Sequence, residues 1–258
     1  MIVAQITDLH IVNEGDLLWD GWDSASALKK AVARLNALKP QPDFLIVTGD
    51  LIDTGEPKAY EHLKRLLAPL TMPIGLIPGN HDGRDGLRAL GLGQAYDPSA
   101  APFCQFAASL GPLRLIGLDT LEEGAAHGTL CQQRLDWFEQ RLAEDTATPT
   151  IVALHHPPFD SGIASMDGIG LKEGRQRFVE LVERAPNVVR ILCGHQHRPI
   201  VTMVGGAVVS LCSSTTVQIP FDVGPKLPTP LRLEPPTLQL HLWQSGSLIS
   251  HTLYIDEF

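Results

Sequence analysis

Short apolar runs alternate along the chain with longer runs whose apolar residues recur every three or four positions. The short runs predict strands at residues 2–6, 44–47, 74–77, 113–118, 150–154 and 188–193. The longer runs predict helices at residues 25–38, 57–67, 132–143 and 173–184. Ser24 is expected to cap the first helix, and Pro57 suits the first turn of the second. The alternation of strand and helix predicts an α/β fold with parallel strands.

After residue 193 the pattern becomes richer in strands, which are predicted at residues 200–204, 207–211, 238–243 and 248–254. Residues 244–247 join the last two strands as a hairpin turn, whereas residues 83–111 show no clear period. The proline-rich segment 220–236 is expected to be a surface loop, because the residues that follow it are too few for a second domain. With 44% hydrophobic residues, the 258-residue chain can form one compact domain.

Polar side chains follow five of the predicted strands at the points where those strands end. They are Asp8 and His10, Asp50, Asn80 and His81, His155 and His156, and His195 and His197. The carboxyl ends of parallel strands lie along one edge of a sheet, where ligand sites form. The sequence therefore predicts that these residues meet in one site.

The donors at this edge are carboxylates, imidazoles and one carboxamide, without thiolates. This set suits Mn, Fe, Co or Zn, and Mg fits less well because so many donors are nitrogen. Residues two apart on extended backbone point to one side, so Asp8 with His10, and His195 with His197, are expected to converge. Glycines at positions 49, 79 and 194 are expected to permit sharp turns beside the ligands. One ion has too few coordination positions for all these donors, whereas two ions sharing Asp50 can use them.

The motifs D-x-H, G-D-x-x-D, G-N-H-D, H-H-P-P and G-H-x-H occur in this order within residues 1–218. In this the chain resembles the calcineurin-like metallophosphoesterase superfamily, most closely the bacterial class III cyclic-nucleotide and glycerophosphodiester phosphodiesterase branch. The resemblance implies an α/β fold, a four-layer α/β/β/α sandwich of two mixed β-sheets flanked by helices. Residues 1–258 would form a single metallophosphoesterase domain, in which 220–258 are a loop plus a C-terminal hairpin completing the second sheet.

The resemblance also implies the role of each polar residue. Asp8, His10, Asp50 and His197 would surround one metal ion, and Asp50, Asn80, His155 and His195 the other. His81 would lie beside the substrate as the catalytic residue. The residues expected to orient ligands or to contact substrate are His156, Asp53, Asp82, Trp19 and Trp22.

The function that follows is hydrolysis of a small phosphodiester, of the 3',5'-cyclic nucleotide or glycerophosphodiester type, by attack of a metal-bound hydroxide. His81 would protonate the leaving alkoxide or stabilise the developing charge. One alternative is a phosphomonoesterase of the same superfamily, but such relatives carry an arginine where this chain has Thr54. The glycerophosphodiesterase relatives carry a histidine near the position of Val217, which this chain lacks. A metal-free scaffold protein is a further alternative, and loss of ligand residues would mark it.

Charge and composition limit the binding partners and the cellular compartment that we expect for this chain. A formal net charge of −9 opposes binding to nucleic acid, because an acidic surface repels the phosphate backbone. Four scattered cysteines without C-x-x-C spacing predict reduced thiols, and the first residues lack the basic start of a signal peptide. We expect a soluble cytoplasmic protein without a membrane span, and from the family a homo-oligomer, a dimer or larger. The loops at 11–23, 157–172 and 215–231 are expected to set substrate specificity.

Overall fold

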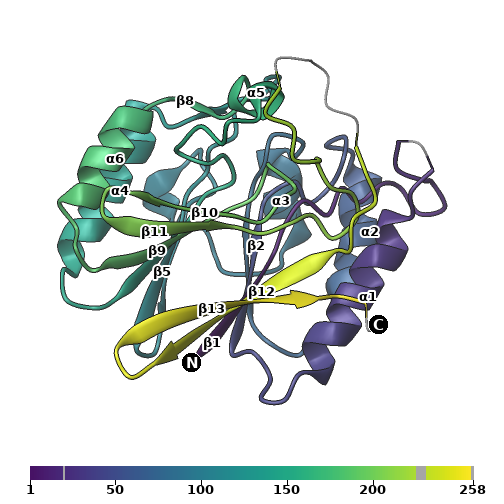
Figure 1. Cartoon of the computed structure of the whole chain (residues 1–258), viewed down its shortest axis with the longest axis horizontal. Helices are drawn as coiled ribbons and strands as arrows, with labels where there is room; N and C mark the ends of the chain where they lie inside the picture. Colours follow the sequence, from purple (N-terminus) through teal and green to yellow (C-terminus); the bar gives the residue numbers. More distant parts are fainter. Residues whose placement is uncertain (20, 225–230, 257–258) are drawn as a thin grey trace.

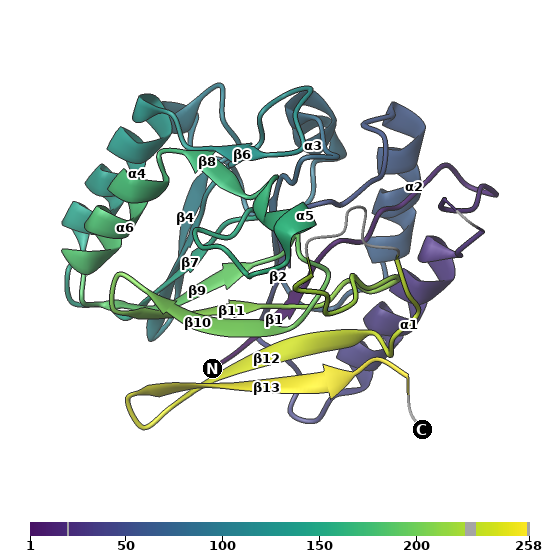
Figure 2. The ribbon, with the colours of Figure 1, turned by 45° about the horizontal axis from the view of Figure 1, so that its top comes forward.

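Two mixed β-sheets lie face to face with helices on both outer faces in the computed structural model of the chain (Figures 1 and 2). The structure describes residues 1–19, 21–224 and 231–256. The predicted four-layer α/β/β/α sandwich is confirmed. Among the described helices, none combines the length and the apolar character that a membrane span requires.

The five-stranded sheet has the strand order β13-β12-β1-β2-β3. Its strands are β1 (Ile2–Ile6), β2 (Phe44–Thr48), β3 (Ile74–Ile77), β12 (Thr237–Gln244) and β13 (Ser247–Tyr254). The first three strands are parallel, and β12 pairs antiparallel with β1, so that Ile2 faces Leu242. The expectation for the C-terminal hairpin therefore needs a correction: the hairpin extends the sheet of the N-terminal strands and does not complete the other sheet.

The six-stranded sheet has the order β10-β11-β9-β7-β5-β4. Its strands are β4 (Phe106–Leu110), β5 (Leu113–Gly117), β7 (Thr150–Ala153), β9 (Val188–Cys193), β10 (Ile200–Val204) and β11 (Ala207–Leu211). The four central strands are parallel, and the edge strands β4 and β10 are antiparallel to their neighbours. Two short strands, β6 (Gly128–Thr129) and β8 (Leu171–Glu173), pair in parallel and so connect two long loops beside this sheet.

The helices cover the outer face of each sheet. They are α1 (Ser24–Ala37), α2 (Pro57–Leu67), α3 (Arg84–Leu90), η1 (Pro98–Ala100), α4 (Gln132–Glu144), α5 (Ala164–Asp167) and α6 (Arg175–Glu183). Leu28, Leu63 and Leu87 of α1, α2 and α3 pack with the five-stranded sheet, and Phe138 and Phe178 of α4 and α6 pack with the six-stranded sheet. A third cluster lies between the sheets. The sequence therefore supplies three apolar layers, as four layers of secondary structure require.

One local expectation was wrong, and one segment without a prediction contains short elements. Asp23, and not Ser24, caps α1, because the Asp23 side chain accepts a hydrogen bond from the backbone N–H of Ser26. The segment without a clear period contains α3, η1 and β4, which are short elements on either side of a glycine-rich loop. Short elements of this kind carry too few periodic positions to be detected from the sequence.

Candidate metal centre

Four of the expected ligands converge at the carboxyl ends of β1, β2 and β9. The donor atoms of Asp8, His10, Asp50 and His197 all lie within 4.8 Å of one another. The Nε2 atoms of His10 and His197 are 3.0 Å apart, and His197 Nε2 is 3.4 Å from an Asp8 carboxylate oxygen. All four residues are buried. We refer to these four residues as the first cluster.

A second cluster shares Asp50 with the first. The Nε2 atom of His155 lies 3.3 Å from Asp50 Oδ2 and 3.3 Å from Asn80 Oδ1. Asn80 Oδ1 is also 3.1 Å from His195 Nδ1. Asp50 is thus the carboxylate common to both groups of donors.

Most of these ligands have left-handed backbone. The φ angles are 52° at Asp8, 46° at His10, 48° at Asp50, 69° at His195 and 46° at His197. The expected extended backbone was therefore wrong at both D-x-H and H-x-H, although the paired side chains do converge. Such residues cost roughly 1–3 kcal/mol each and persist where surrounding contacts hold them. Here the backbone N–H of His195 donates to the Asp8 carboxylate at 3.1 Å, and the N–H of His10 donates to the Asp50 carbonyl at 3.0 Å.

The three glycines beside the ligands act mainly by allowing close approach. Gly49 has a φ of 93°, as a sharp turn requires, but Gly79 and Gly194 do not have positive φ. A Cβ atom at Gly79 would collide with the carboxylate and backbone N–H of Asp50, and one at Gly194 would collide with the Thr7 hydroxyl. The expectation of sharp turns holds at Gly49 alone. At the other two positions glycine is needed because the ligand loops touch.

Backbone carbonyls fix the orientation of two imidazoles. His155 Nδ1 lies 2.8 Å from the Thr48 carbonyl, and His197 Nδ1 lies 2.8 Å from the Val217 carbonyl. A carbonyl only accepts, so each Nδ1 carries the proton and each Nε2 presents a lone pair to the cluster. A lone pair on His197 Nε2 then faces His10 Nε2 at 3.0 Å, which a cation between them would stabilise. The donor set suits divalent metal ions.

The pKa values of the cluster are consistent with ligands. Burial alone would raise the pKa of Asp50, but the charges of His155 and other nearby imidazoles hold it well below its usual range. Burial lowers the pKa of His197, and it lowers that of His195 to about 3, so both remain neutral. Burial would also lower the pKa of His155, but the Asp50 carboxylate raises it to about 9. Asp50, His195 and His197 are thus in the forms that bind metal ions, whereas a metal ion would have to displace the second proton of His155.

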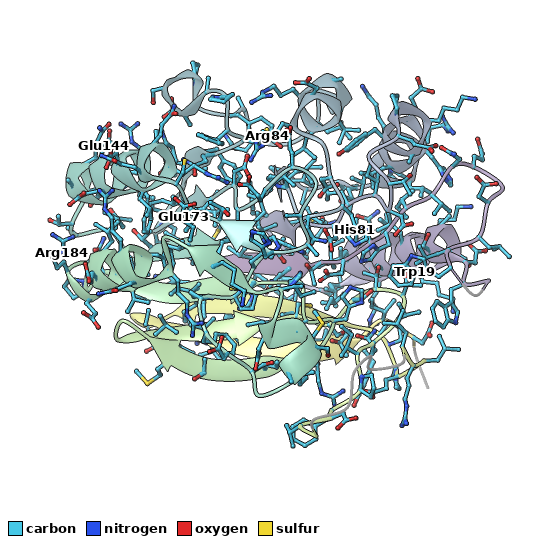
Figure 3. The ribbon with its side chains drawn as sticks, turned by 90° about the horizontal axis from the view of Figure 1, so that it is seen from above. Trp19, His81, Arg84, Glu144, Glu173 and Arg184 are labelled. Atoms are coloured by element: carbon cyan, nitrogen blue, oxygen red, sulfur yellow. The ribbon has the colours of Figure 1, made fainter. Side chains whose placement is uncertain are left out.

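His81 lies beside the clusters and is partly exposed. Its Nδ1 donates to the Asp53 carbonyl at 2.7 Å, which leaves Nε2 free, and its side chain is 32% exposed. Its backbone N–H donates to Asp50 Oδ1 at 3.0 Å, so the residue is held next to the shared carboxylate. The Asp53 carboxylate lies 3.3 Å from His10 Nδ1, as expected for a residue that orients an imidazole. Figure 3 shows His81 near the middle of the view, with Trp19 to one side and Arg84 to another.

The Asp82 carboxylate binds backbone N–H groups and does not orient an imidazole. Its carboxylate accepts hydrogen bonds from the N–H groups of Gly79 at 2.8 Å, Leu51 at 3.1 Å and Ile52 at 3.3 Å, and from the Tyr60 hydroxyl at 3.4 Å. Asp82 therefore ties the loop of Asp50 to the loop of Asn80. This corrects its expected role.

His156 packs behind the second cluster. Its Nδ1 is 2.8 Å from the Thr120 hydroxyl and its Nε2 is 3.2 Å from the Ala126 carbonyl. Its ring centroid lies 4.8 Å from that of His155 and 4.5 Å from that of His195. Both nitrogens therefore have protein partners, although one of them lies within 4.8 Å of donor atoms of His155 and His195, and the ring supports these two imidazoles by contact.

Trp19 lies over the first cluster. Its ring centroid is 4.9 Å from that of His10 and 6.5 Å from that of His197, with which it is stacked, and the residue is 42% exposed. Trp22 contacts Trp19 edge-on at 6.2 Å. Within the loops expected to set specificity, position 20 of loop 11–23 and positions 225–230 of loop 215–231 lie outside the described residues.

Several supporting groups were not expected from the sequence. They are the carbonyls of Thr48, Val217 and Ala126 and the hydroxyls of Thr120 and Tyr60. Every residue offers a carbonyl, so no residue type could have signalled the first three. The two hydroxyl groups come close to their partners only in the folded chain, so the sequence carried no signal for them.

The fold and the ligand set together define a metal-dependent phosphoesterase. The chain belongs to the calcineurin-like phosphoesterase family, whose model matches residues 1–199. It is 34% identical over 260 residues to a probable glycerophosphodiester phosphodiesterase of Arcobacter nitrofigilis, covering 100% of this chain and 94% of the relative. It is 37% identical over 234 residues to a probable cyclic nucleotide phosphodiesterase of Rhodopseudomonas palustris, covering 90% and 84%. A dimetal phosphatase from Danio rerio has the same fold, with a TM-score of 0.74 at 15% identity over 99% of this chain and 96% of that one.

Proposed function

We propose that this chain is a phosphodiesterase that uses two divalent ions to hydrolyse a small diester, of the cyclic nucleotide or glycerophosphodiester type. The observation that supports two ions is the position of Asp50, whose carboxylate contacts donors of both clusters. The names of the relatives include both substrate types, so they support the reaction class and leave the alcohol groups open. All seven expected ligands are present, which argues against a metal-free scaffold.

Charge explains why a phosphate ester would bind here. The carboxylates of Asp8 and Asp50 are the anionic ligands of the two clusters, so two divalent ions would leave the centre positively charged. When bound, such ions polarise phosphoryl oxygens and lower the pKa of a water molecule toward neutrality. His81 contributes a free, partly exposed Nε2 beside the shared carboxylate. From there it can donate a hydrogen bond or a proton to the leaving oxygen of the ester.

Position 54 favours a diester over a monoester. A dianionic monoester gains from a fixed cationic side chain near the metal ions, whereas this chain has an exposed threonine directly after Asp53. A monoanionic diester needs less additional positive charge.

The proposal also includes a single domain formed by residues 1–258, a cytoplasmic location and a homo-oligomer. The four free cysteines support the cytoplasmic location.

We also propose that Trp19 and Trp22 contact the alcohol part of the substrate. The exposed indole of Trp19 is flat and borders the first cluster, so it can pack against a base or another apolar group of the ester. Trp22 supports it from the edge.

The test is an assay of metal-stripped protein to which Mn, Co, Zn or Fe is returned singly. Under each metal, bis(p-nitrophenyl) phosphate and p-nitrophenyl phosphate are compared by kcat/KM, followed by cyclic nucleotides and glycerophosphodiesters. We expect the diester to be the better substrate. A clear preference for the monoester would reject the phosphodiesterase proposal.

A further inference from the structure

We infer that Arg84 and Asp119 are positioning residues for the second metal cluster, acting through Thr120 and His156. The inference rests on the proposed two-ion function and extends it to residues outside the motifs. Arg84 is the first residue of α3 and follows Asn80 by four positions, and Asp119 follows β5.

Asp119 is a buried carboxylate with every oxygen engaged. Arg84 donates to it from Nε at 2.7 Å and from Nη2 at 3.0 Å, a bidentate geometry. The backbone N–H groups of Cys104 and Leu121 also donate to this carboxylate, each at 2.9 Å. Asp119 is 0% exposed, and removal of Arg84 would leave this buried charge with only the longer contact to Arg134 Nη1 at 3.7 Å.

The same contacts fix the loop that begins at Asp119, residues 119–130. Arg84 Nη2 donates to the Leu121 carbonyl at 2.6 Å, and Arg134 Nη1 donates to that carbonyl at 2.9 Å. The two guanidinium groups lie 5.1 Å and 4.4 Å from the centre of the Phe103 ring. The backbone N–H of Thr129 donates to the Thr120 carbonyl at 3.0 Å and closes the loop on itself.

Loop 119–130 holds His156 at both ring nitrogens. The Thr120 hydroxyl lies 2.8 Å from Nδ1, and the Ala126 carbonyl accepts from Nε2 at 3.2 Å. Because the carbonyl requires a proton on Nε2, Nδ1 accepts from the hydroxyl, and the tautomer is fixed. Gly128 completes the contact surface, since a Cβ atom there would collide with the His156 imidazole.

His156 in turn contacts both imidazoles of the second cluster. Its ring is nearly perpendicular to that of His155, at 87°, and is tilted by 51° to that of His195. Arg84 is therefore linked to His155 and His195 through loop 119–130 and His156. It is linked to Asn80 through the backbone of residues 80–84. The ion pair thus adds to the support that His155 has from the Thr48 carbonyl and His195 from the Asp8 carboxylate.

Loosening the ion pair should weaken the second ion more than the first. Loss of a group that orients a metal ligand typically lowers metal affinity by about 10- to 100-fold. Arg84 acts through Asp119, Thr120 and His156, so we expect a loss near the lower end, about 10-fold. The first cluster has its own supports in the Val217 carbonyl and Asp53, and its affinity should change little.

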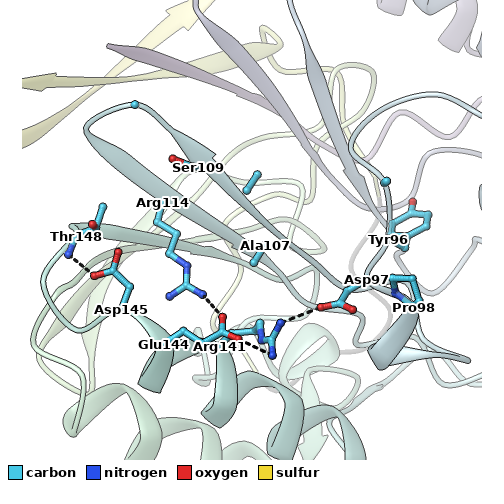
Figure 4. A pocket seen from close by; sticks show the side chains of 13 residues that line it. Tyr96, Asp97, Pro98, Ala107, Ser109, Arg114, Arg141, Glu144, Asp145 and Thr148 are labelled. Atoms are coloured by element: carbon cyan, nitrogen blue, oxygen red, sulfur yellow. Dashed lines mark hydrogen bonds and ion pairs between the residues drawn. The ribbon is translucent and has the colours of Figure 1, made fainter.

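The experiment is a Mn²⁺ titration of metal-stripped protein, in which electron paramagnetic resonance measures the free ion. Wild type is compared with Arg84→Ala, Arg84→Lys and Thr120→Val. The lysine keeps the charge but cannot form the bidentate contact, and the valine keeps the ion pair but loses the hydroxyl. Arg141→Ala is the matched control, because Arg141 also contacts two carboxylates, Asp97 at 3.1 Å and Glu144 at 2.7 Å (Figure 4). These residues line a surface hollow of about 530 Å³ that none of the predicted ligands borders.

We expect Arg84→Ala and Thr120→Val to raise the dissociation constant of the second Mn²⁺ ion by about 10-fold. The value for Arg84→Lys should lie between those of these variants and that of wild type. The first constant, and both constants of Arg141→Ala, should stay within about twofold of wild type. If Arg84→Ala fails to fold, Thr120→Val alone decides, because the substitution is small. The inference would be overturned if the dissociation constant of the second ion were unchanged in the variants, or if both clusters lost affinity equally. A wild type that binds one ion would instead overturn the two-ion function, and this inference with it.

Discussion

The Nε2 atoms of His10 and His197 lie 3.0 Å apart, although 187 positions separate the two residues in the sequence. The Val217 carbonyl fixes a lone pair on His197 Nε2, and Asp53 favours the proton on His10 Nδ1. Burial would lower the pKa of His10, but Asp53, Asp50 and Asp8 raise it, so its Nε2 can also carry a proton and donate it to His197 Nε2. A bound cation would take the place of that proton between the two imidazoles.

The first prediction concerns metal removal. Stripping the protein of metal should lower its melting temperature, and returned Mn²⁺ should raise the free energy of unfolding by about 2.7 kcal/mol per site at roughly 100 times the dissociation constant. His10→Ala should lose most of the gain from the first site. Calorimetry with and without metal checks both statements, and an identical melting temperature in all four samples would contradict them.

The second prediction concerns the shared carboxylate. Asp50→Ala should abolish tight binding of both ions, because Asp50 contacts donors of both clusters. Asn80→Ala should weaken mainly the second ion, since its Oδ1 contacts His155 and His195. Equilibrium dialysis with metal analysis measures the stoichiometry. Two tightly bound ions in Asp50→Ala would show that the carboxylate does not bridge.

The third prediction concerns His81. If its Nε2 protonates the leaving oxygen, His81→Ala should slow a diester with a poor alkoxide leaving group by about 100-fold or more. A diester that releases p-nitrophenolate should be slowed far less, because that anion departs without a proton. The ratio of the two kcat values measures the role. Equal losses on both substrates would assign His81 to positioning the ester.

The fourth prediction concerns His241, a fully buried histidine of β12 that lies away from the metal centre. Burial, helped by the charge of Arg190, lowers its pKa from 6.5 to about 3. The unfolded chain therefore binds more protons than the folded chain below pH 6.5, and stability falls as the pH drops from there toward 3. Between pH values of about 7.5 and 5, this one group should remove about 2 kcal/mol of stability.

His241→Gln tests this, because glutamine can replace the contacts to Ser250 and Gln5 without titrating. The variant should lose less stability than wild type over the same pH interval, as measured by urea unfolding. His251→Gln, an exposed histidine on the neighbouring strand β13, is the control. The same slope in wild type and His241→Gln would contradict the prediction.

Apolar runs predicted the buried strands and the place of the polar motifs after them, and the resemblance to the family implied the sandwich. The sequence was not sufficient for the backbone of the ligands, since left-handed φ angles at Asp8 and His197 come from contacts between loops. The role of Asp82 depends on which N–H groups lie nearby, and those are set by the close approach at Gly79. The partner of the hairpin was also missed, because an alternating strand fits the edge of either sheet.

The pairing of β12 with β1 has a consequence for the order of events during protein synthesis. Residues 2–6 are made long before their neighbours on one side, residues 237–244. Until residues 237–244 have left the ribosome, β1 has an unpaired edge, and Asp8 and His10 follow a strand that is bonded on one side only. His195 and His197 also emerge long after Asp8 and His10. The nascent chain therefore acquires a complete first cluster only after residue 197 has emerged, and metal loading should follow that point.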